Sequence, residues 1–255
     1  MAAKRVPTLS AEQLSKVLTL MKGADGVELK LSVPDADQRS VIDELDMDPV
    51  GAEIRQVAFF DTPDLALDKV GVVVRARRIQ GKPADSVVKL RPVEPDALSP
   101  TLRKTPGFGV EVDAMPGGFV CSASMKGTAD PQLARDVFRG RQPLRKLFSK
   151  DQRAFFKSNA PAGIELEDLA VLGPIAILKL KFTPEALGRK MVAELWMYPD
   201  GTRLLELSTK CVPGEAFDVA ARTKSFLGSH GVDLSSVQQT KTRAALQHFA
   251  AILPG

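Results

Sequence analysis

The sequence predicts an α+β protein built on an antiparallel, eight-stranded, tunnel-like β-barrel with helices outside it and a helical pair at the C-terminal end. Two observations support this prediction. Segments with a period of two recur along most of the chain, and in most of them one face is charged while the other is apolar. After residue 212 the period becomes helical. We therefore expect an N-terminal extension with a short helix (1–24), a barrel (25–212) and a helical segment packed on the barrel (213–255).

The elements follow one another in an order typical of a sheet that curls and closes. Strands are expected at residues 27–33, 54–61, 72–79, 86–91, 109–113, 177–182, 192–198 and 203–210. The last two are joined by Asp200-Gly201, a dipeptide typical of hairpin turns. Helices are expected near residues 10–21, 38–46, 131–138, 184–190, 215–227 and 240–252.

The composition excludes several classes of protein. The chain has 255 residues with 44% hydrophobic and 26% charged residues, which is ordinary for a globular domain and unlike a disordered chain. The longest apolar run, residues 169–178, is about half of what a membrane span requires. No apolar stretch follows the first basic residues, so we expect a cytoplasmic protein without a membrane partner. The net charge of +4, without interleaved basic and aromatic residues, argues against nucleic acid as a partner.

The scarce cysteines and histidines limit the available chemistry. Cys121, Cys211, His230 and His248 lie far apart in the sequence, which argues against zinc, disulfides and Cys/His catalysis. Neither GxxxxGK[ST] nor GxGxxG occurs, so nucleotide binding by a P-loop or a Rossmann motif is excluded. Chemistry in this protein must use carboxylates, lysines and arginines.

Pairs of charged residues share one face of six expected strands. These pairs are Glu28 and Lys30, Arg75 and Arg77, Lys89 and Arg91, Glu111 and Asp113, Lys179 and Lys181, and Glu206 and Lys210. A single such face is typical of a sheet that is wet on one side. The alternative is a closed barrel whose charged faces line its interior. We favour the barrel because long cations in pairs, rather than short polar side chains, occupy these faces.

A tunnel rich in Arg and Lys suits a ligand with several negative charges, and arginine matches phosphate particularly well. Carboxylates in the same cavity would repel that ligand unless a cation lay between them. Mg²⁺ and Mn²⁺ are the ions that suit carboxylate and phosphate oxygens. The lining therefore predicts a small-molecule or inorganic polyphosphate ligand with Mg²⁺ or Mn²⁺ as cofactor.

One long segment of the sequence resembles a known family. Residues 59–77, FFDTPDLALDKVGVVVRAR, are similar to the segment Y-[FY]-D-T-x-x-x-x-L-x-x-x-G-x-x-[LV]-R-x-R of the CYTH family. These are the triphosphate tunnel metalloenzymes, which include class IV adenylate cyclases and thiamine and inorganic triphosphatases. Further motifs of the family resemble Glu28 to Lys30, Lys89 to Arg91, Glu111 to Asp113, Gln152-Arg153 and Glu206 to Lys210.

The resemblance implies a function and a set of site residues. It implies that the protein binds a triphosphate-bearing or polyphosphate-bearing compound in the tunnel and hydrolyses its phosphoanhydride with a divalent metal. Phosphate would be bound by Lys30, Arg75, Arg77, Lys89, Arg91, Arg153, Lys181 and Lys210, among which Lys30, Arg153 and Lys210, together with Glu28, would be catalytic. The metal would be held by Glu28, Glu111, Asp113 and Glu206. Two alternatives are open, an adenylate cyclase of class IV type and a non-catalytic binder of polyphosphates or organophosphates.

The sequence departs from the family pattern at two places. Gly26 stands where the N-terminal motif E-x-E-x-K has its first glutamate. Lys179 and Lys181 align with a late E-x-E pair that holds metal in the family, although Glu194 is an alternative acidic ligand. These lysines favour anion binding and weaken metal binding. We therefore expect tripolyphosphate to bind without any divalent ion.

Three further groups have simpler interpretations. Asp61-Thr62 before a proline is interpreted as a turn or a helix cap rather than a metal ligand. Trp196 and Tyr198 are interpreted as packing residues rather than a platform for a base. Lys241 at the start of the last helix is assigned to a solvated face, with a position at the tunnel mouth as the alternative.

Overall fold

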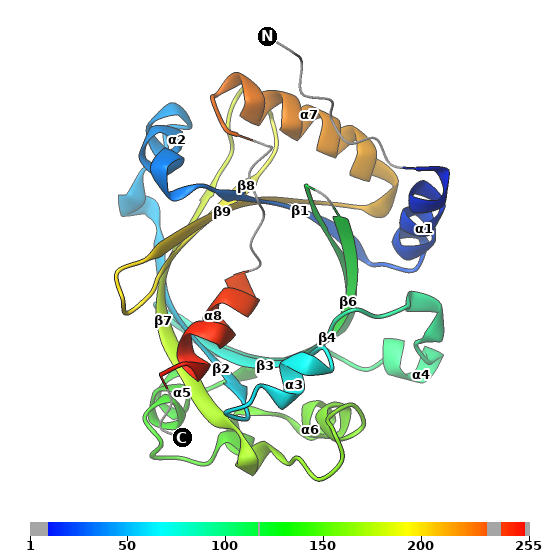
Figure 1. Ribbon diagram of the computed structural model, residues 1–255, viewed down its shortest axis with the longest axis vertical. Coiled ribbons are helices and arrows are strands. Elements are labelled where there is room, and N and C mark those ends of the chain that lie inside the picture. Colours follow the sequence, from blue (N-terminus) through cyan, green and yellow to red (C-terminus); the bar gives the residue numbers. More distant parts are fainter. Residues whose placement is uncertain (1–9, 117, 234–240, 253–255) are drawn as a thin grey trace.

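The strands close into a single barrel in the computed structural model, which describes residues 10–116, 118–233 and 241–252 (Figure 1). The strands are β1 (Gly26–Val33), β2 (Glu53–Asp61), β3 (Val72–Ile79), β4 (Lys82–Leu90), β5 (Phe108–Met115), β6 (Gly118–Ala129), β7 (Ala170–Phe182), β8 (Met191–Met197) and β9 (Arg203–Cys211). Their order around the barrel is β1-β5-β6-β4-β3-β2-β7-β8-β9, and β9 pairs with β1 to close it. The expected tunnel-like barrel is confirmed.

The barrel differs from the expectation in two details. Within the described residues the barrel has nine strands instead of eight. The barrel is also mixed, because β1 pairs in parallel with β5 whereas all other neighbouring strands pair antiparallel. The additional strand is β6, whose centre runs from Cys121 through Ser122, Ala123 and Ser124 to Met125. These residues alternate between the two faces, but they are small, and alanine and serine give little strand signal in a sequence.

Eight α-helices occur in the described part of the chain. They are α1 (Ala11–Lys22), α2 (Gln38–Glu44), α3 (Ala66–Lys69), α4 (Pro100–Arg103), α5 (Pro131–Phe138), α6 (Lys150–Lys157), α7 (Ala216–Ser229) and α8 (Lys241–Ala250). The expected helix near 184–190 is a turn, and α6 was missed although Ser149 and Gln152 form a capping box at its start. Residues 1–9 of the N-terminal extension and Thr240 of the last expected helix lie outside the described residues. No helix in the described ranges is long and apolar enough to cross a membrane.

The outward faces of the strands are apolar and carry the outer helices. Val27, Val74 and Val112 belong to one buried cluster that also includes side chains of α1, α5 and α6. Leu31 and Leu207 belong to a second cluster with residues of α2 and α7. Burying each such side chain contributes roughly 1.5–3 kcal/mol. The outer face therefore holds the helices, and the opposite faces of the same strands are left to line the interior.

Helix α8 packs on inward-facing side chains at one end of the barrel, and in the view of Figure 1 it runs from the opening of the ring across its rim. Its residues Leu246 and Phe249 are buried against Phe59, Ile175 and Trp196, which point inward from β2, β7 and β8. The interior is thus apolar at this end, which we call the α8 end. The C-terminal segment was expected to pack on the barrel, and within the described residues α7 packs on its outer face whereas α8 packs on inward-facing residues at one end.

Candidate functional site in the barrel interior

The rest of the interior is lined by the charged faces expected from the sequence. Strand pairing sets Glu28 of β1 directly beside Asp113 of β5 on one side and Lys210 of β9 on the other. The alternating residues Val27 and Leu29 point to the outer cluster. Because side chains alternate between the faces of a strand, residues from strands far apart in the sequence meet in the enclosed space.

Asp113 is the centre of the largest ion cluster. Its fully buried carboxylate lies 2.8 Å from Lys30 Nζ, 3.5 Å from Lys89 Nζ and 3.4 Å from the Arg91 guanidinium. Burial alone would raise the pKa of Asp113, but the surrounding cations, Lys89 first, hold it well below its ordinary value. The Asp113 carboxylate is therefore ionised and committed to three cations.

Lys30 and Lys89 respond differently to this shared partner. Burial would lower the pKa of Lys30, but Asp113 and Glu28 outweigh it and raise the pKa. Burial dominates at Lys89, together with repulsion from neighbouring cations, and lowers its pKa to about 8. The charge of Lys89 therefore depends on pH near neutrality. Its partner Asp113 lies 3.5 Å away, farther than the 2.8 Å between Asp113 and Lys30.

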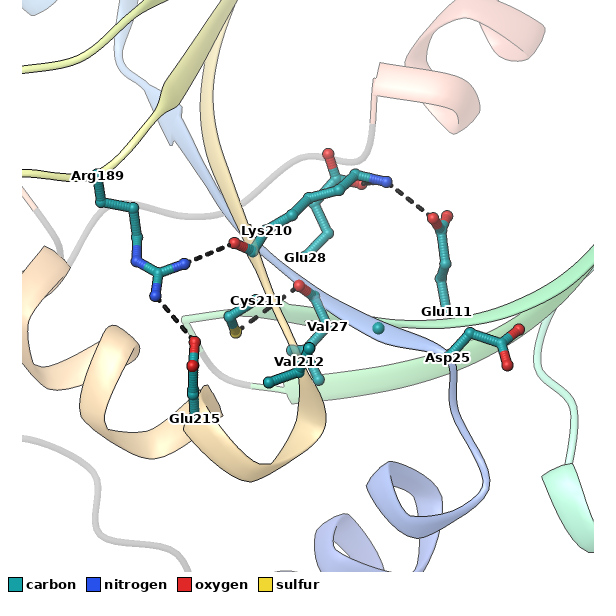
Figure 2. A pocket seen from close by; sticks show the side chains of 10 residues that line it. Asp25, Val27, Glu28, Glu111, Arg189, Lys210, Cys211, Val212 and Glu215 are labelled. Carbon is teal, nitrogen blue, oxygen red and sulfur yellow. Dashed lines mark hydrogen bonds and ion pairs between the residues drawn. The ribbon is translucent and has the colours of Figure 1, made fainter.

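A pocket of about 460 Å³ lies at the rim of one end of the barrel, lined by Glu28, Glu111 and Lys210 and, from the outer side, by Val27 and Cys211 (Figure 2). Lys210 Nζ lies 2.8 Å from Glu111 Oε1 and 3.9 Å from Glu28 Oε2. Burial would raise the pKa of both carboxyls, but Lys30 and then Lys210 lower the pKa of Glu28, and Lys210 lowers that of Glu111. We call this end of the tunnel the pocket end.

The two arginines of β3 are not equivalent. Arg77 donates to both oxygens of Asp85, with contacts of 2.7 and 2.9 Å. Arg75 Nε is buried without a hydrogen-bond partner among the described residues. Burial and the neighbouring Arg77 lower the pKa of Arg75 to about 10, which leaves it charged at neutral pH. Arg75 is thus the interior cation that most lacks an internal anion.

Two glutamates and two lysines meet toward the α8 end. Glu194 of β8 and Glu206 of β9 are direct cross-strand partners. Lys241 of α8 contacts both, at 2.7 Å from Glu206 and at shorter range from Glu194, and Lys179 of β7 lies 2.9 Å from Glu194. Lys241 therefore does not lie on a solvated helix face, and the assignment of its side chain to solvent is wrong.

Two residues implied by the resemblance lie apart from this cluster. Arg153 is exposed on α6, outside the barrel, where it donates to the carbonyl of Phe148. Its expected role as a tunnel ligand is contradicted, because Gln152 and Phe156 turn the other face of α6 to the barrel. Lys181 is exposed near the end of β7 and forms no ion pair within the described residues.

The other interpretations from the sequence agree with the structure. Asp61 accepts hydrogen bonds from the backbone N–H groups of Leu67 and Asp68 in α3, so it caps that helix. Trp196 is buried and packs on Phe59 inside the barrel. Both were interpreted as structural residues, and both are.

The interior carboxylates do not fit a resident divalent ion in this arrangement. Each of them lies next to one or more ammonium or guanidinium groups, which compete with a metal for the same oxygens. In the described part of the chain, no three acidic, histidine or cysteine side chains are grouped so that they could hold a metal. The donor chemistry favours Mg²⁺ or Mn²⁺, but the protein's own cations already neutralise the donors.

Comparison with solved structures reveals the same fold elsewhere. HpAC1 from Hippeastrum, named as a candidate adenylyl cyclase with a dominant triphosphatase activity, superposes with a TM-score of 0.64 at 16% identity, over 89% of this chain and 97% of that chain. A candidate adenylate cyclase from Bacillus halodurans gives 0.59 at 13% identity, over 86% of this chain and 97% of that chain. The fold is that of the CYTH proteins.

These similarities extend over nearly the whole of both solved chains, so the barrel and its helices belong to one shared architecture. No protein-family model and no curated protein matches the chain. At such low identity the comparison supports the fold, and the chemistry of this CYTH-like tunnel has to be argued from its own residues.

Proposed function

We propose that the protein binds the triphosphate group of a small molecule, or inorganic tripolyphosphate, inside the tunnel. The supporting observation is the guanidinium of Arg75, whose Nε is buried without a hydrogen-bond partner in the described residues, among other inward-facing cations. A buried charge without an anion is costly, and a ligand oxygen at this place would supply the missing hydrogen bonds.

The charge balance of the interior supports the same proposal. The inward-facing cations include Lys30, Arg55, Arg75, Arg77, Lys89, Arg91, Lys179, Lys210 and Lys241, and the carboxylates that contact them are Glu28, Glu53, Asp85, Glu111, Asp113, Glu194 and Glu206. The cations outnumber the carboxylates, so an anion is attracted without any added metal. Arginines and lysines on several strands can bind successive phosphate groups along the tunnel.

A second candidate function is hydrolysis of the bound triphosphate. It is favoured by the shared fold with HpAC1, whose description includes a dominant triphosphatase activity. The cations proposed to bind the ligand would also offset the charge that spreads over phosphate oxygens during transfer. Cyclisation of ATP needs the same cations and differs in the position of the nucleophile.

One screen tests binding and turnover together. Tripolyphosphate, ATP and thiamine triphosphate are each titrated into the protein by calorimetry in a chelator, and phosphate release and cyclic AMP are then measured with Mg²⁺ or Mn²⁺. We expect at least one compound to bind in the chelator. The absence of binding to all three in the chelator would contradict the proposal, and release of cyclic AMP instead of phosphate would favour the cyclase.

A further inference from the structure

The contact between Lys241 and the two glutamates joins the last helix to the inside of the barrel. Glu194 and Glu206 face each other across β8 and β9. Like charges directly opposite in a sheet are destabilising, so the pair requires a cation between its carboxylates. Both residues are nearly buried, at 9% and 5% exposure, which reduces screening by water.

The ammonium of Lys241 supplies that cation from a separate element. It contacts one oxygen of each glutamate, at 2.7 Å from Glu206 and at shorter range from Glu194. Burial would lower the pKa of Lys241, but the two carboxylates raise it. Burial would likewise raise the pKa of Glu194, but Lys241 and Lys179 bring it well below its ordinary value. Lys241 and Glu194 are therefore both charged.

The position of Lys241 in its helix is unfavourable without these partners. It is the first residue of α8, where a cation opposes the helix dipole. Two residues later, Arg243 is exposed and has no ion-pair partner in the described residues. The side chains of Ala245, Leu246 and Phe249 are buried against inward-facing residues of the barrel. Helix α8 is thus held by an apolar face and by one charged contact at its inner tip.

We propose that Lys241 is a tethered counter-ion, which occupies between Glu194 and Glu206 the position that a divalent cation would otherwise take. The lysine fixes α8 on the barrel and keeps the α8 end of the tunnel free of metal. In consequence, removal of its charge creates a divalent-cation site there. This counter-ion role of Lys241 does not depend on the proposed binding of triphosphate.

The test measures Mn²⁺ binding in the full-length protein without any phosphate compound. Lys241→Met removes the charge and keeps an apolar stem of similar length, and Arg243→Gln removes a charge from the same helix away from the glutamates. Mn²⁺ is titrated and followed by electron paramagnetic resonance. Fluorescence of Trp196, the single tryptophan, is recorded as well, because Lys241 Nζ lies 5.2 Å from its ring centroid.

We expect Lys241→Met to bind Mn²⁺ about tenfold or more tightly than the wild type, with a change in Trp196 emission, because Glu206 then lacks a cation and Glu194 keeps only Lys179. Arg243→Gln should match the wild type in both signals. Equal Mn²⁺ affinity in Lys241→Met and Arg243→Gln would overturn the proposal. Tripolyphosphate binding to the wild type is measured in a separate titration. The Mn²⁺ result can therefore be interpreted even if the protein does not bind tripolyphosphate.

A compensated variant covers the case in which Lys241→Met does not fold. Adding Glu206→Gln removes one of the two like charges, so the double variant needs no counter-ion. We expect it to fold, by circular dichroism, and to bind Mn²⁺ no better than the wild type. If neither variant folds, the lysine acts through packing and not charge, and the proposal is rejected.

Discussion

Lys30 Nζ and Asp113 Oδ1 lie 2.8 Å apart and connect two strands that pair in parallel. Asp113 is fully buried, whereas the cations around it reach the tunnel space. This geometry makes the carboxylate an internal stand-in for a ligand anion: it stabilises the cations when the tunnel contains only water. An added polyanion therefore competes with Asp113 for the same ammonium and guanidinium groups.

Asp113→Asn should separate stability from ligand binding. We expect a loss of about 3–5 kcal/mol in the free energy of unfolding, because three half-buried cations lose their common buried partner. Tripolyphosphate should bind about tenfold more tightly, since these cations no longer have an internal competitor, and should raise the melting temperature of the variant more than that of the wild type.

The control for this substitution is Asp64→Asn, which makes the same change in an exposed ion pair with Lys69. Exposed pairs contribute little, so we expect a much smaller loss there than in Asp113→Asn. Calorimetric melting and titration measure both quantities. An Asp113→Asn protein as stable as Asp64→Asn would show that the buried cluster does not have the role described.

Arg75→Gln should weaken tripolyphosphate binding by about 1.5–3 kcal/mol, the scale of hydrogen bonds to charged groups. Arg75 Nε has no internal partner, so its loss removes contacts to the ligand without exposing a carboxylate. Arg153→Gln is the matched control, and we expect it to bind like the wild type because Arg153 lies outside the barrel. Equal losses in the two variants, measured by calorimetry, would place the ligand elsewhere.

Lys89 should give the affinity a pH dependence. Its pKa of about 8 means that it loses its charge as the pH rises from 7 to 9. We expect the ratio of wild-type to Lys89→Met affinity to fall about tenfold over that interval, as one proton must be taken up for tight binding. Using the ratio removes the ligand's own titration, which is the same for both proteins.

The same group should affect stability in the opposite direction. Its folded pKa of about 8 lies below the unfolded value of about 10.4, so between these values the unfolded chain binds more protons. The contribution of Lys89 to the free energy of unfolding therefore rises with pH through that window. Chemical denaturation at pH 7.5 and 9.5, with Lys89→Met as reference, measures this. A contribution that falls with pH would mean that Lys89 gains more from Asp113 than it loses by burial.

The period-two pattern was sufficient to predict the barrel and most of the interior cations. Residues 28 and 30, for example, were placed on the charged face, and Leu29 on the apolar one, because alternation is a local property of a strand. Lys241 could not be placed in this way. Its position depends on α8 packing on one end of the barrel, which is a matter of tertiary packing between Phe249 and an apolar end formed by four distant strands.

Arg153 is the converse case, because the sequence motif placed it in the tunnel and the structure places it outside the barrel. The motif Gln152-Arg153 resembled one of the family's motifs. The face of α6 that meets the barrel is determined by Gln152, whose side-chain amide donates hydrogen bonds to backbone carbonyls of β4 and β6. A helix of eight residues has a helical period, and a two-residue motif does not determine which of its sides is buried. The structure alone shows that Gln152 points inward and Arg153 outward.

The last prediction concerns the two departures from the family pattern, Gly26 and Lys179. A side chain fits at Gly26, because a Cβ there would have only the carbonyl oxygen of Cys211 within 4 Å, at 3.6 Å. Lys179 lies 2.9 Å from Glu194, and burial lowers the pKa of this lysine despite that contact. Gly26 can therefore accept glutamate without a steric obstacle. Lys179→Glu replaces an ion pair by a carboxylate directly opposite Glu194, and this pair of like charges requires a cation.

Gly26→Glu combined with Lys179→Glu should raise Mn²⁺ affinity and lower the affinity for tripolyphosphate in a chelator, since both changes make the lining more negative. Each single variant should give part of both effects. Gly26→Glu with Lys224→Glu, the second change lying on the exposed side of α7, has the same net charge and serves as control. We expect this control to show only the part of both effects that Gly26→Glu produces. If the two double variants respond alike, the charge at position 179 has no effect beyond the net charge of the protein. If the interior variant exchanges more anion affinity for metal affinity than the control does, the charge at position 179 helps to determine which ion the tunnel accepts.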